Sequence, residues 1–193
     1  MRLVETDSET LQWFPTHMRW NSDGEREEWA ELCGAALLSA HEKRPKRRRI
    51  KAVRQQLDAF AQVLSKLTPA DQAFLFIPTP DQTPVPAFIL MAECEGDRQT
   101  TLRSMVQADA ESLVRPVEVD PFATERLGEG LRSTRYWSTP EGQLMATVRY
   151  GWRLEQINTD LCFYMVWDDP GKMAVFTDTV DDFVRSLWVN VTD

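Results

Sequence analysis

The sequence is poor in the residues that enzymes and metal sites use most often. Its 193 residues include only two histidines, His17 and His41, and three cysteines, Cys33, Cys94 and Cys162, at spacings of 61 and 68. No CxxC pair and no cysteine–histidine zinc spacing occurs. Neither glycine-rich phosphate motif, GxxxxGKS/T or GxGxxG, is present. We therefore expect no catalytic residue, no metal ligand and no cofactor.

Long apolar runs are also missing. No segment approaches the roughly 18 apolar residues of a membrane-spanning helix, and the first ten residues contain no apolar stretch of signal-peptide length. An odd number of cysteines without a framework spacing suits a reducing compartment. We expect a cytoplasmic protein with no membrane partner.

The acids outnumber the bases, but the bases are not spread evenly. The chain has 22 basic and 30 acidic residues and a formal net charge of −8. Eight of the bases fall within residues 43–54, which contain no acid, so the remaining 14 bases and 30 acids carry a net charge of −16. The eight are Lys43, Arg44, Lys46, Arg47, Arg48, Arg49, Lys51 and Arg54. This separation of charge indicates a docking surface.

Residues 22–67 are predicted to form a helical hairpin. Ser22 and Glu25 have the spacing of a capping box, and Pro45 suits a break between two helices. Apolar residues recur at three- and four-residue intervals on both sides of Pro45. The first stripe is Trp29, Leu32, Cys33, Ala36, Leu37 and Ala40, and the second is Ile50, Val53, Leu57, Phe60, Leu64 and Leu67.

Residues 73–167 are predicted to be mostly antiparallel sheet. The short apolar runs 73–77 and 85–92 are typical of strands buried on both faces, and the run 161–167 should lie centrally for the same reason. Residues 99–111 are typical of a short helix. Residues 114–119 indicate a strand that Pro116 places at an edge.

A β-hairpin is predicted from 131–138 and 143–154, which flank Thr139-Pro140-Glu141-Gly142. Proline and glycine at these positions favour a type I turn closed by a residue with positive φ. The register that follows places Ser133 opposite Arg149, Arg135 opposite Thr147 and Glu129 opposite Arg153. Asp169 and Pro170 then begin a helix over 170–189.

These elements predict an α+β fold. We expect an antiparallel sheet of five to seven strands with helices on both faces, an N-terminal helical hairpin and a C-terminal helix. No stretch reads as an interior linker, so residues 1–193 are expected to form a single globular domain.

The order of these segments carries a resemblance. A tryptophan-bearing entry (WFPTHMRW, 13–20) leads into paired helices, then AFLFIPTP and VPAFILMAE, an aromatic hairpin, a DP turn and a helix ending FVRSLWV. The chain resembles a loose class of uncharacterised cytoplasmic proteins from actinobacteria. Residues 73–189 are similar in layout to the PsbP-like sandwich. That resemblance implies a binding or accessory role and assigns no functional residue.

The basic run has three interpretations. It can dock on an acidic protein surface, including this protein's own surface in a homodimer, or it can be a solvated connector. Nucleic acid is disfavoured, because the remaining −16 repels a polyanion and no aromatic residue lies between His41 and Ala59 for base stacking. On a helix, contiguous basic residues would also spread around much of the cylinder.

A second candidate lies on the predicted β-hairpin. Arg135 and Arg149 become diagonal neighbours on one face, where with Trp137 they could bind a small ligand or an anion, or serve an enzyme. The alternative is a solvent-facing surface of ion pairs.

The other polar groups are best explained structurally. His41 should favour the negative pole at the end of the first helix, and His17 should be a half-buried structural residue. Cys33 and Cys162 lie in apolar stripes, and the acids beside Cys94 disfavour its thiolate. Asp178, Asp181 and Asp182 should form a solvated helix face. The function we expect is that of a non-catalytic accessory or adaptor protein acting through protein contacts.

Overall fold

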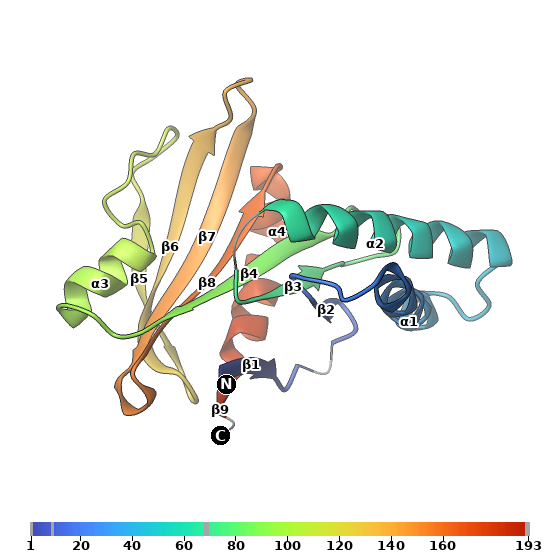
Figure 1. The fold of residues 1–193 in the computed structure, drawn as a ribbon. Helices are drawn as coiled ribbons and strands as arrows, with labels where there is room; N and C mark the ends of the chain where they lie inside the picture. Colours follow the sequence, from blue (N-terminus) through green and yellow to red (C-terminus); the bar gives the residue numbers. More distant parts are fainter. Residues whose placement is uncertain (1, 9, 68–69, 192–193) are drawn as a thin grey trace. The chain divides into compact units, whose positions relative to one another are not determined.

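The computed structural model describes residues 2–8, 10–67 and 70–191, and its fold is α+β, as predicted (Figure 1). The chain divides into two compact units. Glu9–Ala87 form one, called the hairpin unit below. Met1–Ser8 and Phe88–Asp193 form the other, called the sheet unit. The expectation of a single domain stays a prediction.

The helices among the described residues are α1 (Asp23–His41), α2 (Arg47–Leu67), α3 (Arg98–Met105) and α4 (Pro170–Arg185), with a 3₁₀ turn at Glu155–Ile157. An antiparallel sheet of seven strands has the order β2-β3-β4-β8-β7-β6-β5. Its strands are β2 (Trp13–Thr16), β3 (Gln72–Phe76), β4 (Val85–Ala92), β5 (Glu118–Thr124), β6 (Gly128–Ser138), β7 (Leu144–Leu154) and β8 (Thr159–Trp167). A second sheet pairs β1 (Arg2–Thr6) with β9 (Leu187–Val191).

The helical hairpin forms with the predicted start and break. Ser22 accepts a hydrogen bond from the Glu25 amide, 3.2 Å away, and the Glu25 carboxylate accepts one from the Asn21 amide at 2.9 Å. The first bond satisfies an amide group that a helix start leaves unpaired, and the second ties the residue before the N-cap to Glu25. The chain then turns through Pro45 between α1 and α2.

The buried face of α1 differs from the predicted stripe. Its buried residues are Arg26, Ala30, Gly34, Leu37 and Leu38, whereas Leu32 of the predicted stripe is 65% exposed. Gly34 lies where a Cβ would be 3.5 Å from Val53, so α1 and α2 approach closely there. Periodicity misses this face because it gives no weight to glycine or to a charged residue.

Arg26 can be buried between α1 and α2 because two acids neutralise its charge. Its guanidinium lies 2.6 Å from Asp23 and 2.7 Å from Asp58 of α2. The prediction for α2 was closer to the structure. Val53, Leu57 and Leu64 are buried, while Ile50 is 39% exposed at the start of the helix.

The sheet unit confirms the predicted β-hairpin and its register. Ser133 is opposite Arg149 and Arg135 is opposite Thr147. Gly142 has a φ of +85°, which closes the turn as expected. β8 is the fourth of seven strands, so the strand that is apolar on both faces is central.

Two helices cover opposite faces of this part of the sheet. From α4, Phe183 lies 6.1 Å from Phe163 of β8, and Asp181 bonds Tyr150 of β7. Along β7 the alternate residues face α3, where a Cβ on Gly151 would be 3.2 Å from Val106. The short α3 therefore covers one face of this part of the sheet, and α4 covers the other.

Three element boundaries were predicted wrongly. α4 ends at Arg185, and β9 follows it and pairs with β1, a strand that local periodicity did not indicate. α3 ends at Met105, and the next strand begins at Glu118 instead of Val114. The segment between them is held by β6, because the Leu113 amide donates to the carbonyl oxygen of Tyr136 at 2.9 Å. The following strand, β5, does lie at an edge and contains Pro121.

Candidate functional site

The basic run lies where the two helices of the hairpin unit meet. α1 ends at His41 and α2 begins at Arg47, two residues after Pro45. The carbonyl oxygen of Lys46 accepts from the Arg49 amide at 2.8 Å and from the Ile50 amide at 3.1 Å. The first turn of α2 contains no acid. Its cations therefore face the positive pole of the helix, an unfavourable arrangement of about 0.3–1 kcal/mol per exposed charge.

Two of the eight basic residues are held by acids of the hairpin unit. Arg49 lies 2.6 Å from Asp81 and 3.2 Å from Glu42. The bond to Asp81, then that to Glu42, raises the pKa of Arg49 above its ordinary value. Arg54 lies 3.3 Å from Glu31 of α1. These two residues belong to the packing of the hairpin unit.

The other six are exposed, and none has an ion-pair partner within the described part of the chain. They are Lys43, Arg44, Lys46, Arg47, Arg48 and Lys51, and we call them the basic tip. At about 100° per residue, Arg47, Arg48 and Lys51 occupy an arc of about 100° on α2. Arg54 lies about 20° from Arg47 around the helix, so only Arg49, about 200° from Arg47, faces elsewhere. The expected spread around the helix is therefore wrong for the unpaired cations.

His41 is the last residue of α1, on the other side of the connection between the two helices. Its Nδ1 lies 2.9 Å from the carbonyl oxygen of Leu37, and its Nε2 lies 3.1 Å from that of Pro78. The ring thus joins the last turn of α1 to the loop after β3, at the helix end where a cation is favourable. His17 is exposed, contrary to the half-buried position expected, and its ring packs edge-on against Trp20 at 4.9 Å.

The second candidate, Arg135 with Arg149 and Trp137, lies at the end of α3. Arg149 donates to the carbonyl oxygen of Met105 at 3.2 Å, and Arg135 donates to that of Glu111 at 2.7 Å. Trp137 donates to Thr147 at 2.9 Å. The two arginines thus bind carbonyl oxygens at the negative pole of α3 and just beyond it. These contacts describe a structural use of the two arginines.

Arg153 has a different partner from the one predicted. It pairs with Asp160 of β8, with 2.7 Å between Nε and Oδ1, and both side chains are almost fully buried. Arg98 instead donates to the Glu129 carbonyl oxygen at 3.0 Å. The hydrogen bonds from Arg153 lower the pKa of Asp160, against the opposing effect of burial. The register of the β6–β7 hairpin could not show this ion pair, because Asp160 lies on β8.

The cysteines are poor nucleophiles for the reason expected. Burial raises the pKa of Cys33 to about 12 and that of Cys162 to about 11. The pKa of Cys94 is raised as well, first by burial and then by Asp160. The sequence pointed instead to the two glutamates beside it, because Asp160 is distant in the chain.

The acids of α4 are only partly solvated. Asp181 binds Arg132 at 3.1 Å and accepts a hydrogen bond from the buried Tyr150 hydroxyl. Asp182, not Asp181, pairs with Arg185, at 3.1 Å. The prediction of a solvated face is therefore wrong for Asp181, which faces β6 and β7.

Within residues 2–8, 10–67 and 70–191, no three histidine, cysteine or acidic side chains are grouped as a metal site would require. None of the described helices is both long enough and apolar enough to cross a membrane. Comparisons with models of protein families, with curated proteins and with solved structures found no match.

Proposed function

We propose that this protein is a non-catalytic cytoplasmic accessory protein that binds an acidic protein surface through the basic tip. The observation that carries the proposal is the contrast within one run of eight cations. Arg49 and Arg54 are paired with acids, whereas the six residues of the basic tip are exposed and unpaired in the described structure.

The arrangement of the tip supports this function. Like charges gathered at the positive pole of α2 repel one another and the helix dipole, and an acidic partner relieves both effects. Ile50, 39% exposed among these cations, adds an apolar contact that a protein surface can cover. A compartment that keeps thiols reduced is supported by the free cysteines Cys33, Cys94 and Cys162.

A nucleic acid is the competing polyanion. The segment from Glu42 to Asp58 contains no aromatic side chain that could stack on a base. The charge of −16 outside the run also opposes the approach of a long polyanion. Both features favour a compact acidic protein surface that reaches only the tip.

The test is binding of a fluorescently labelled polyglutamate peptide, compared with a short DNA duplex, by anisotropy. We expect the peptide to bind and the triple variant Arg47→Glu/Arg48→Glu/Lys51→Glu to bind it at least about tenfold more weakly, or about 1.4 kcal/mol. Lys172→Glu is the matched control, because Lys172 is an exposed cation in the first turn of α4.

Peptide binding that the triple variant loses and Lys172→Glu retains would support the proposal. Tighter binding of the duplex than of the peptide would replace it with nucleic-acid binding. No binding of either probe at about 0.1 M salt, or equal losses in both variants, would overturn it.

A further inference from the structure

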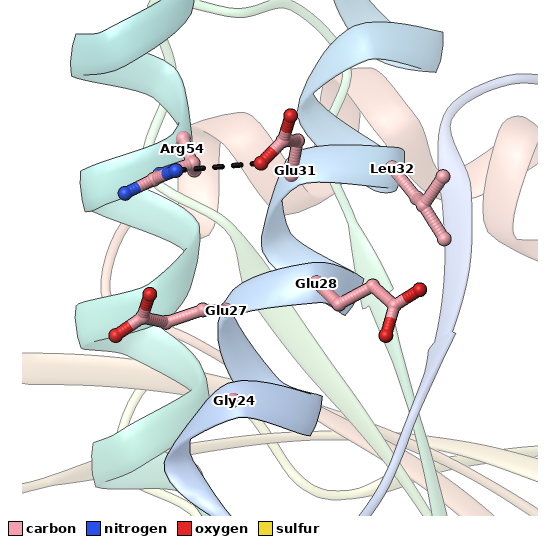
Figure 2. Close-up of a pocket in the computed structure, with 6 residues that line it drawn as sticks. All are labelled: Gly24, Glu27, Glu28, Glu31, Leu32 and Arg54. Atoms are coloured by element: carbon pink, nitrogen blue, oxygen red, sulfur yellow. Dashed lines mark hydrogen bonds and ion pairs between the residues drawn. The ribbon is translucent and has the colours of Figure 1, made fainter.

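The hairpin unit also carries an acidic surface. A shallow hollow of about 420 Å³ is lined by Gly24, Glu27, Glu28, Glu31, Leu32 and Arg54, which we call the acidic hollow. Figure 2 shows Arg54 joined to Glu31 across the two helices, Glu27 directed toward α2 and Glu28 directed away from it. Arg54 therefore neutralises only one of three glutamates.

Among the described residues, the acidic hollow has unpaired carboxylates and an exposed apolar side chain. Glu27 and Glu28 are exposed and have no ion-pair partner among the described residues. Leu32 is 65% exposed beside them, so a partner with cations around an apolar side chain would fit. The basic tip has a similar composition, since Ile50, 39% exposed, adjoins Lys51 in the chain and follows Arg47 by one turn of α2.

The tip and the hollow lie on one face of the hairpin unit. Arg47, Lys51 and Arg54 follow the i, i+4, i+7 spacing, so they form one stripe along α2. Arg54 lines the hollow, and Arg47 and Lys51 belong to the tip. Seven residues of helix, about 10 Å, separate Arg47 from Arg54.

A face with both charges in fixed positions is complementary to itself. When two copies lie antiparallel, the tip of each meets the hollow of the other, and both contacts form at once. This is the reciprocal geometry of a two-fold interface, in which the first patch contacts the second on both copies. The arrangement closes, so it yields a dimer and not a filament.

We infer that the acidic surface bound by the basic tip is the acidic hollow of a second copy of this chain. The inference rests on the proposed function, because it names the partner of the same tip. Each copy carries a net charge of −8, which opposes association over long distances. At about 0.1 M salt the Debye length is about 10 Å, so contacts between the opposite patches outweigh that repulsion.

The experiment is a charge exchange followed by sedimentation velocity at several protein concentrations. The tip-reversed variant is Arg47→Glu/Arg48→Glu/Lys51→Glu, and the hollow-reversed variant is Glu27→Lys/Glu28→Lys. We expect the wild type to dimerise at about 0.1 M salt and to be monomeric at about 1 M, where the Debye length is about 3 Å. Each variant alone should be monomeric.

An equimolar mixture of the two variants is the decisive test of the inferred dimer. In a mixed pair, the reversed tip of one copy meets the reversed hollow of the other, and the two unaltered patches also meet. We therefore expect the mixture to recover the dimer, which also shows that both variants fold. Lys172→Glu and Glu141→Lys, exposed charges of the sheet unit, serve as controls that keep the wild-type behaviour.

The outcomes separate this inference from the proposed function. A wild type that stays monomeric while its tip still binds polyglutamate would overturn the dimer and leave the proposed function standing. A dimer that survives both reversals, or a mixture that stays monomeric, would also overturn the inference. A wild type that neither binds polyglutamate nor dimerises would overturn both proposals.

Discussion

The sheet unit and the tip of the hairpin unit use arginine in different ways. In the sheet unit, Arg132, Arg149 and Arg153 are directed inward and bind carboxylates or carbonyl oxygens between elements far apart in the sequence. At the tip of the hairpin unit, Arg47 and Arg48 are exposed and unpaired within the described structure. The comparison teaches that a cation's role follows from what surrounds it, since burial demands a partner and solvent does not.

The starts of α4 and α2 show the same contrast. The Asp169 carboxylate accepts hydrogen bonds from the Gly171 and Lys172 amides at 2.9 and 3.2 Å, and Pro170 follows as the first helical residue. α2 begins at Arg47 with no acid in its first turn. The first arrangement stabilises a helix, and the second weakens one. A surface kept at a cost in stability is the kind of feature that binding explains.

The largest expected effect is loss of the buried pair in the sheet unit. Asp160→Asn removes the carboxylate that neutralises the buried Arg153 and leaves its guanidinium only carbonyl oxygens as acceptors, so we expect a loss of about 3 kcal/mol in the free energy of unfolding. Urea unfolding at neutral pH measures it. Glu155→Gln is the control, because its pair with Arg98 is exposed. Equal losses in the two variants would contradict the contrast between buried and exposed pairs.

The lowered pKa of Asp160 also makes the stability of the protein depend on pH. The pKa of Asp160 is lowered in the folded state, so its contribution is present above the unfolded value of about 3.9 and is lost as pH falls through that value and below it. We expect wild-type stability to fall between about pH 5 and pH 2, and Asp160→Asn to show a smaller fall. Parallel slopes in the two proteins would assign the acid sensitivity to other carboxylates.

A smaller effect distinguishes two neighbouring acids of α4. Asp181→Ala leaves the buried Tyr150 hydroxyl and Arg132 without their shared acceptor, at a cost of about 1–3 kcal/mol. Asp182→Ala removes only an exposed pair with Arg185, and we expect a change below about 1 kcal/mol. Thermal or urea unfolding compares them directly. If Asp182→Ala costs as much as Asp181→Ala, burial is not what separates the two carboxylates.

The smallest effect has the opposite sign. Arg47→Glu/Arg48→Glu places acids at the positive pole of α2, and we expect stability to rise by about 0.3–1 kcal/mol per charge at low salt. Lys172→Glu should give a similar gain per charge in α4. A destabilised tip variant would show that these arginines make a structural contribution, and it would break the contrast between the two units.

Local pattern was sufficient for features that depend on neighbouring residues in the chain. The capping box at Ser22, the turn closed by Gly142 and the register of Arg135 with Thr147 follow from short-range geometry. The central place of β8 also followed, because a strand that is apolar on both faces needs cover on both. The charge separation of the basic run was likewise complete in the sequence.

What the sequence by itself determined was therefore the types of the longer elements, the antiparallel β-hairpin and the presence of eight clustered cations. Only the tertiary structure decided which cations are free, because the carboxylates that hold Arg49 and Arg54 come from the β3–β4 loop, the end of α1 and its outer face. It also joined β1 to β9 and Arg153 to Asp160. Such pairings depend on how distant segments pack, and periodicity within a segment contains no information about them.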